Sequence, residues 1–344
     1  MAEMQGALLL GSARCGSTLI SRMLRSHPGI LSLSEFFVSL GAHAFRPDVI
    51  GGRDLWRHLS RPSPMMRRLA NPDIAPDEFL YHQGLGRFDP FDCPPLLAIT
   101  LPHLTDQPDR VFDALSRIVP DWPERPLSVQ YTALFAEIDR LTGHTPRNVS
   151  AGRVWAERSG GSMAAAATLR RMFPQARLVV LTRAGADTAL SLCAYKPSWP
   201  AIWMWKQGLG LLDPIHPRRH FGRGAVWPLL ARLGGPLLRH ILSRPPHLED
   251  CGAFWSAMMQ RGVAGLRGAR VEMIRYEALI ADPHAQAARL GHAIAGAAPP
   301  EWLAAAAAMP QARPSRLTAL EPAQHRALLA ACAPGEAALS ELGV

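Results

Sequence analysis

The stretch GSARCGST, residues 11–18, constrains the fold of this chain more than any other feature of the sequence. Four apolar residues, 7–10, precede it. A helical pattern of apolar positions follows it, carried by Leu19, Ile20, Met23 and Leu24. This is the order of a buried strand, a glycine-containing loop and a helix. Such a loop turns its N–H groups toward an anion, and the helix N-terminus adds donors and partial positive charge. The stretch therefore predicts a phosphate cradle.

The spacing of this cradle is close to that of a Walker A loop, G-x-x-x-x-G-K-[ST], but the lysine is absent. Gly11, Gly16 and Thr18 occupy matching positions, whereas Ser17 stands where the lysine would be. In nucleoside triphosphatases that lysine reaches the β- and γ-phosphates, so its absence disfavours ATP or GTP hydrolysis. The cation of this loop is Arg14, inside the loop. It suits an anion whose terminal group is transferred without a metal ion.

Composition narrows the class of partner. The 344 residues suffice for one large α/β domain or two small ones. The net charge is +9 and arginine dominates over lysine, which favours bidentate binding of phosphate or sulfate. Nucleic-acid binding is the alternative for such a charge, but no run of basic residues supports it, so no nucleic acid is expected.

Cysteine usage and the N-terminus bear on the compartment. Five widely spaced cysteines without a C-x-x-C pair argue against zinc and against a disulfide framework, and indicate a reducing compartment. The first apolar run is too short for a signal or a membrane span. We therefore expect a cytoplasmic protein without a transmembrane segment. No set of His, Cys or carboxylates has metal-site spacing, so no metal is expected.

A second apolar run, 30–33, predicts a strand that ends just before Glu35. Connections between parallel strands place both loops at the carboxyl edge of the sheet, where open α/β sheets bind ligands. Arg14 and Glu35 can then face one pocket. The residues alone leave two equal interpretations of Glu35, which are an exposed turn residue and a base.

Two later strand ends carry arginines. A short strand at 153–156 runs into the segment that contains Arg158. The clearest buried strand, 178–181, is followed by Arg183 and a helix. Ser191 lies about two helical turns beyond Arg183, so it can share a face with the loop below.

The remaining regions carry weaker signals. Residues 41–126 are rich in Pro, Arg and Asp and predict short helices and loops. A helical stripe follows at 128–141, and helices are also expected at 254–266 and within 299–344. From 196 to 250, Pro, Gly, Trp and His gather in a manner typical of an insert or lid.

Four stretches together resemble the sulfotransferases that use 3′-phosphoadenosine 5′-phosphosulfate (PAPS). GSARCGST and the following helix resemble their 5′-phosphosulfate loop, in the arginine form R-x-G-[ST]-T that is similar to tyrosylprotein and some bacterial sulfotransferases. LVVLTRAGADTALSL resembles their 3′-phosphate motif. WAERSG resembles W-x-E-K-[ST]-P, and VEMIRYEALIADP resembles the late R-Y-E-x-L-x-x-D-P segment. The resemblance covers about residues 5–37, 150–195 and 250–295.

The resemblance implies an α/β fold that is P-loop-like and three-layered, with a central parallel sheet flanked by helices. A single domain would span 1–344, with its core at about 5–195 and 250–295 and a helical insert, 196–250, over the acceptor site. The implied reaction moves a sulfuryl group from PAPS to an acceptor hydroxyl. A carbohydrate or small molecule is favoured as the acceptor, and a peptide tyrosine stays open. A homodimer is compatible with the resemblance. The alternatives are a P-loop nucleotide kinase or ATPase, and a catalytically silent nucleotide- or nucleic-acid-binding protein.

The resemblance also assigns roles to residues of this chain. Glu35 would be the base, and Arg14 would meet the charge on the departing phosphate. Arg158 is a second candidate for stabilising the sulfuryl group. For Arg158 a purely structural role at the end of a strand is nearly as well supported. The cofactor-binding residues would be Arg14, Cys15, Gly16, Ser17, Thr18, Arg183, Ser191 and Tyr276, although Tyr276 is equally a core residue. Three positions depart from the family pattern and put the affinity for the cofactor in doubt: Gly160, Ala184 and Ala186.

Overall fold

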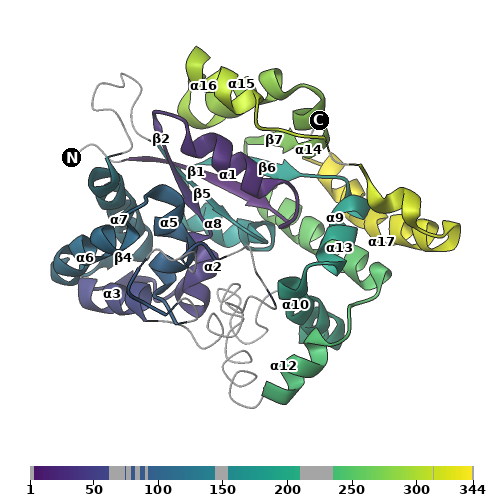
Figure 1. Cartoon of the computed structure of the whole chain (residues 1–344), viewed down its shortest axis with the longest axis horizontal. Helices are drawn as coiled ribbons and strands as arrows, with labels where there is room; N and C mark the ends of the chain where they lie inside the picture. Colours follow the sequence, from purple (N-terminus) through teal and green to yellow (C-terminus); the bar gives the residue numbers. More distant parts are fainter. Residues whose placement is uncertain are drawn as a thin grey trace.

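A computed structural model describes residues 4–61, 74, 79–81, 86–89, 92–143, 154–209, 235–312 and 314–342. Its centre is a five-stranded parallel sheet with the order β2-β5-β1-β6-β7 (Figure 1). The strands are β1 (Gln5–Gly11), β2 (Ile30–Ser34), β5 (Val154–Ser159), β6 (Arg177–Thr182) and β7 (Val271–Arg275). All four pairings between them are parallel. The predicted α/β fold with a central parallel sheet is therefore confirmed.

The apolar run of β1 explains why helices cover both faces of this sheet. Leu8 and Leu10 are buried in one hydrophobic cluster, whereas Ala7 and Leu9 are buried in another. Side chains alternate across a strand, so the two clusters lie on opposite faces. A strand buried on both sides is continuously apolar rather than alternating, as parallel sheets require.

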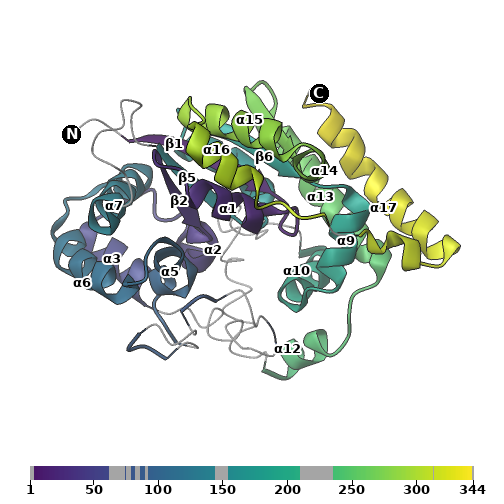
Figure 2. The same ribbon diagram turned by 45° about the horizontal axis from the view of Figure 1, so that its top comes forward.

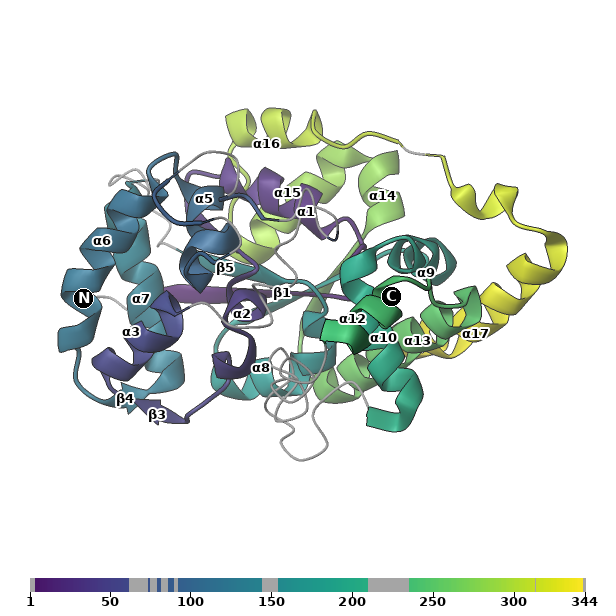
Figure 3. The same cartoon turned by 60° about the horizontal axis from the view of Figure 1, so that its bottom comes forward.

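One face of the sheet is covered by α1 (Ser17–Arg25), α15 (Pro283–Ala295) and α16 (Pro300–Ala307), which share the cluster of Ala7 and Leu9. The other face is covered by α2 (Phe36–Leu40), α7 (Leu127–Thr142), α8 (Ala166–Met172) and α13 (Leu248–Leu266), which share the cluster of Leu8 and Leu10. Figure 3 shows β1 between α1 and α15 on one side and α8 on the other. The result is a three-layer, P-loop-like arrangement.

The helix predicted after the loop is α1, and the predicted strands 30–33 and 178–181 lie within one residue of β2 and β6. Strand β1 begins two residues before the predicted 7–10, and β5 ends three residues after the predicted 153–156. The helix expected at 254–266 is longer and begins at Leu248. The region 41–126 contains α3 (Gly52–Ser60), α5 (Leu101–Leu104) and α6 (Pro108–Ile118), in agreement with short helices. It also contains an unpredicted antiparallel pair, β3 (Val49–Ile50) with β4 (Arg125–Pro126).

The proposed insert is described only in part. Its described ends hold α10 (Trp199–Met204) and α12 (Gly235–Leu242), whereas residues 210–234 lie outside the described residues. Arg153, at the start of a predicted strand, also lies outside them. The division of the chain into core and acceptor-site insert therefore stays a prediction.

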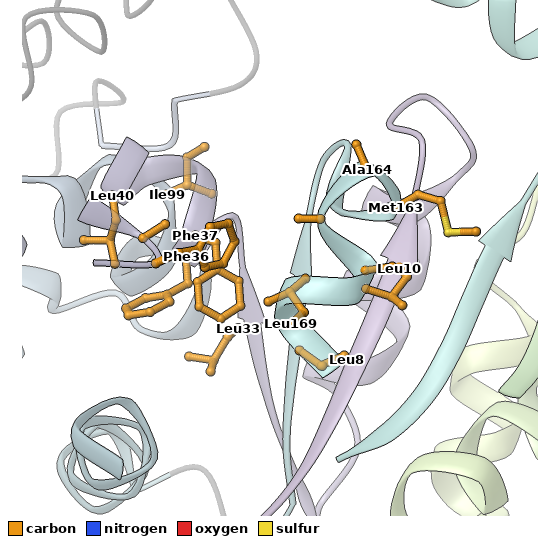
Figure 4. Close-up of a cluster of buried hydrophobic side chains, with 14 of the residues drawn as sticks. Leu8, Leu10, Leu33, Phe36, Phe37, Leu40, Ile99, Met163, Ala164 and Leu169 are labelled. Atoms are coloured by element: carbon orange, nitrogen blue, oxygen red, sulfur yellow. The ribbon is translucent and has the colours of Figure 1, made fainter. Parts of the chain in front are cut away.

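The short helix α2 is fixed to the core by two aromatic side chains. Phe36 and Phe37 are buried, and their ring centroids lie 5.4 Å apart in an edge-to-face arrangement. Figure 4 shows both rings beside Leu33 of β2, with Leu40 further along the helix. This packing places the residue that links β2 to α2, Glu35, at the carboxyl end of the sheet.

The helices that follow β6 and β7 pack beside the last helix of the chain. Strand β6 leads into α9 (Gly185–Cys193), and β7 leads into α14 (Tyr276–Ala281). The long α17 (Pro322–Ser340) packs against both α13 and α9. In Figure 2 these helices lie together on the right of the sheet.

Candidate functional site

The loop between β1 and α1 has an unusual backbone. Ala13 has a φ of 67° and Arg14 a φ of 58°, both left-handed, and Gly16 has a φ of 84°. Non-glycine residues are uncommon in this region, and they gather at ligand-binding loops where surrounding structure holds them. A Cβ at Gly16 would lie 2.4 Å from Cδ2 of Tyr276. Glycine is therefore required there both by backbone angle and by close packing.

The N-terminus of α1 fits an anion. Its N-cap residue, Gly16, has no side chain that could cap the helix, and its first turn holds no acidic residue. The first N–H groups of a helix need acceptors, and the macrodipole favours a negative one. Ser17 is buried at this N-terminus, whereas Thr18 is exposed. These features are compatible with an anion at the start of α1.

Arg14 reaches from the loop to α9. Its Nε donates a hydrogen bond to Oγ of Ser191 at 3.1 Å, although the two residues are 177 positions apart in the chain. Its guanidinium also lies 4.6 Å from the ring centroid of Tyr195. Arg14 remains exposed overall. The structure therefore brings together the cation of the first predicted motif and the hydroxyl of the second.

Arg183 and Tyr276 form a second junction. The guanidinium of Arg183 lies 5.0 Å from the ring centroid of Tyr276, a cation–π distance. Its Nη2 is 3.4 Å from Oδ1 of Asp187, one turn along α9. Because Tyr276 also packs against Gly16, its ring joins the first loop to the end of β6.

Acidic side chains that the sequence analysis did not single out hold the start of α9. The N–H of Ala184 donates to Glu277 at 2.9 Å, and the N–H of Gly185 donates to Glu336 at 2.7 Å. Glu336 comes from α17, at the far end of the chain. Ser315 donates to Asp187 at 2.8 Å from the same C-terminal region. Glu277 lies in the quoted RYE stretch, but no sequence signal marks Glu336, because only the fold brings it to α9.

Glu35 and Arg158 form an ion pair at the end of the sheet. Glu35 is 8% exposed and Arg158 6%, so Glu35 is not an exposed turn residue. Arg158 donates through Nη1 to Oε1 of Glu35. The N–H of Gly160 donates to the other carboxylate oxygen of Glu35 at 2.8 Å. Sequence reasoning proposed both side chains for the site but did not predict that they pair.

The rest of the Arg158 guanidinium is also engaged. Its Nε donates to Oγ of Ser21 at 2.9 Å, and its Nη2 donates to Oγ of Ser34 at 2.7 Å. A buried guanidinium held by three oxygens keeps its position. Arg158 therefore fixes the carboxylate of Glu35 from inside the sheet.

Gly160 brings this ion pair close to the first loop. A Cβ at Gly160 would lie 3.5 Å from Cβ of Ala13 and 3.6 Å from both carboxylate oxygens of Glu35. Ala13 is the neighbour of Arg14 in the loop. The Glu35 carboxylate and the loop thus lie on two sides of the position where the family pattern has proline.

Burial raises the pKa of two further ionisable groups. It raises the pKa of the Cys15 thiol, which is 3% exposed among apolar side chains of α1 and the sheet. Cys15 therefore stays a neutral packing residue. Burial, with the nearby negative charge of Glu35, raises the pKa of Glu157 to about 8. The sequence analysis quoted Glu157 within WAERSG but assigned it no role.

The described residues hold neither a metal-binding cluster nor a membrane-spanning helix. No group of three or more His, Cys, Asp or Glu in these ranges is arranged to hold a metal ion. Likewise, none of the described helices combines the length and apolarity needed to cross a bilayer.

Comparison with known proteins decides the family. The profile of the sulfotransferase family matches residues 7–198, which is 192 of the 344 residues. The chain belongs to the sulfotransferase family. The matched range of this sulfotransferase includes Arg14, Glu35, Arg158, Arg183 and Ser191, whereas Tyr276 lies beyond it. The match does not favour the nucleotide-kinase alternative.

Solved structures similar to this sulfotransferase are distant. The sulfotransferase domain of the Synechococcus PCC 7002 olefin synthase is 15% identical, with a TM-score of 0.42 over 94% of this chain and 82% of that chain. Sulfotransferase STF1 from Mycobacterium tuberculosis H37Rv is 15% identical, with a TM-score of 0.42 over 96% and 77%. STF9 from Mycobacterium avium is 18% identical, with a TM-score of 0.37 over 96% and 76%. No curated protein matches the chain.

Proposed function

We propose that this sulfotransferase moves the sulfuryl group of PAPS to an acceptor hydroxyl, and that the acceptor is a carbohydrate or another small molecule. The observation that carries the proposal is the hydrogen bond from Arg14 to Ser191. It joins the cation of the 5′ loop to the hydroxyl assigned to the 3′-phosphate. A nucleotide with phosphates at both ends of one ribose needs these two groups at adjacent positions.

The two ends of the nucleotide would be held by different elements. Backbone N–H groups of residues 15–18, with the hydroxyls of Ser17 and Thr18, would bind the 5′-phosphate. Arg183 and Ser191 would bind the 3′-phosphate, and Tyr276 would lie beside the adenine. The left-handed loop and the start of α1, which has glycine as its N-cap and no acidic residue in its first turn, support this assignment.

Glu35 would act as the base. When PAPS is bound, it supplies a sulfuryl group whose bond to the bridging phosphate oxygen breaks as a bond to the acceptor oxygen forms. Glu35 takes the proton of the acceptor hydroxyl, and Arg14 meets the negative charge that develops on the departing phosphate. Arg158 orients the Glu35 carboxylate, and it is the second candidate for contacting the sulfuryl group. These steps use arginines and backbone donors, and they call for no metal ion.

The alternatives differ in what they would require. A nucleotide kinase or ATPase would need magnesium-dependent ATP turnover without a Walker lysine. A silent nucleotide- or nucleic-acid-binding protein would keep its function after Glu35→Ala and Arg14→Ala. A peptide tyrosine as acceptor, a homodimer and a cytoplasmic location stay predictions.

Titration calorimetry tests the proposal. The purified protein is titrated with adenosine 3′,5′-bisphosphate (PAP), the product left after transfer, and separately with ATP and magnesium. We expect PAP to bind and Arg183→Ala to weaken that binding by about 10- to 100-fold, because a hydrogen bond to a charged group contributes about 1.5–3 kcal/mol. Arg171→Ala, which removes an arginine from the exposed side of α8, is the control. A preference for ATP, or no binding of either nucleotide, would overturn the proposal.

A further inference from the structure

The backbone of Glu35 needs support from outside its own segment. Glu35 has φ 56° and ψ 27°, a left-handed conformation in a residue with a full side chain, and α2 begins immediately after it. In the described residues the Glu35 side chain does not cap α2. Such a conformation persists only where neighbouring groups fix it. One of these is the hydrogen bond from the Glu35 N–H to the carbonyl of Arg158 at 2.8 Å.

Ser159, on β5, provides the cap that α2 does not have locally. Its Oγ accepts the N–H of Phe37 at 3.1 Å and the N–H of Val38 at 3.3 Å. These are N–H groups of the first turn of α2, which have no partner within the helix. Ser159 is 1% exposed, so water does not replace this contact.

Glu157 fixes the direction of that hydroxyl. Oγ of Ser159 donates to Oε1 of Glu157 at 2.6 Å, and Glu157 is 1% exposed. With its single proton directed at Glu157, the hydroxyl turns its lone pairs to the two amides. Residues 157, 158 and 159 alternate across β5, so Glu157 and Ser159 lie on the α2 side of the strand while Arg158 points to α1.

We propose that Glu157 and Ser159 are positioning residues for the Glu35 carboxylate: Glu157 orients the Ser159 hydroxyl, which caps α2 and so sets the backbone angle from which Glu35 reaches Arg158 and the acceptor. This inference rests on the proposed role of Glu35 as the base. We call the hydrogen bonds from Glu157 through Ser159 to the amides of α2 the relay. The inference predicts that loss of the relay slows the transfer step and leaves the nucleotide site intact, because the 5′ loop and α9 are not part of the relay.

The chain offers a matched control on the same helix. Ser39 lies in α2 and is also 1% exposed, but its Oγ has no hydrogen-bond partner among the described residues. Ser159→Ala and Ser39→Ala therefore delete the same buried atom, one inside the relay and one outside it. Glu157→Gln keeps an acceptor for Ser159, whereas Glu157→Leu removes it.

Three measurements are made on each full-length variant: the Kd for PAP, the hydrogen exchange of the amides of residues 36–38, and the rate of sulfuryl transfer from PAPS to 4-nitrophenol as a probe acceptor. For Ser159→Ala and Glu157→Leu we expect unchanged Kd, faster exchange and a kcat lower by about 10- to 100-fold, the cost of a small misplacement of a reacting group. Ser39→Ala and Glu157→Gln should stay near the parent in all three.

The outcomes separate this inference from the proposed function. Equal exchange in Ser159→Ala and Ser39→Ala would overturn the relay, and this measurement needs no acceptor. Faster exchange with an unchanged kcat would show a cap without a role in positioning, which also overturns it. If the parent protein fails to bind PAP, the proposed function fails instead, whatever the exchange shows. A weaker Kd in Ser159→Ala would indicate general unfolding and contradict the restricted effect.

Discussion

The two ends of the candidate site are built in different ways. The end at β2 and β5 is buried, and its ion pair, Glu35 with Arg158, is held by serines and backbone groups of the sheet and α1. The end at β6 is more open, since the side chains of Arg183 and Asp187 are 22% and 16% exposed. It is held by residues from the C-terminal part of the chain, among them Glu277 and Glu336.

This difference suits the two tasks that we propose for the site. A group that takes a proton must be positioned closely and shielded from water, which a sheet edge with rigid partners provides. A group that only binds a phosphate tolerates exposure, because an arginine is charged at any physiological pH. We therefore expect substitutions at the buried end to change the rate of transfer and those at the open end to change affinity or stability.

The largest effect is expected for Glu35→Gln. Glutamine keeps the size of the side chain but cannot accept the proton of the acceptor, and a positioned base contributes about 10²–10⁴-fold to a rate. The kcat for sulfuryl transfer should fall within that range while calorimetry shows PAP binding close to the parent value. If instead PAP affinity falls and the rate of bound enzyme holds, the separation of the two ends is wrong.

Arg14→Ala should have the next largest effect, and it should affect both tasks, because Arg14 touches Ser191 from the first loop. Removing one donor that meets developing charge lowers kcat by about 10²–10³-fold. Arg22→Ala, at an exposed position in the last turn of α1, is the control and should leave the rate unchanged. Transfer at the parent rate by Arg14→Ala would contradict the proposed mechanism.

Sequence reasoning succeeded where the signal is local. The strand–loop–helix around Arg14 and the strand before Arg183 are each encoded within about 15 residues, so periodicity and glycine spacing suffice to place them. Parallel strands end at one sheet edge, so the sequence also predicted that these loops lie at that edge. It did not predict the contact between Arg14 and Ser191.

Sequence reasoning failed where contacts join distant segments through burial. The pairing of Glu35 with Arg158 depends on β2 lying beside β5, and the order of strands is not written in either segment. Glu336 reaches Gly185 only because α17 folds back onto α9. The raised pKa of Glu157 likewise comes from what surrounds it, and no motif reports that.

Glu157→Gln tests the buried end through the pH dependence of stability. The pKa of Glu157 rises from an ordinary value of 4.5 to about 8 in the folded protein, chiefly through burial. Between these two values the folded state binds more protons than the unfolded state. The contribution of Glu157 to the free energy of unfolding is therefore full below pH 4.5 and is lost as the pH rises to about 8. Glutamine does not ionise, so a protein with glutamine at this position loses no stability by this route.

The measurement is the Tm of parent and variant in parallel at several pH values. We expect the Tm of Glu157→Gln relative to the parent to rise from pH 5 toward about pH 8 and then to level off, because the folded parent must otherwise bury a second carboxylate near Glu35. A difference in Tm that stays constant with pH would show that Glu157 is charged in the folded protein throughout. The buried end would then hold charged groups just as the open end does.

The smallest effect is expected for Glu336→Gln, at the open end. The Gly185 N–H that starts α9 would keep an acceptor but lose a negative charge at the positive end of the helix, which is worth about 0.3–1 kcal/mol. A change of this size lowers Tm by only a few degrees, roughly 1–3 °C for a chain of this length. PAP affinity should hold or improve slightly, since a negative charge near Arg183 is removed. A loss of transfer with Tm unchanged would place α17 in the reaction itself, and the open end would then share the task now assigned to the buried one.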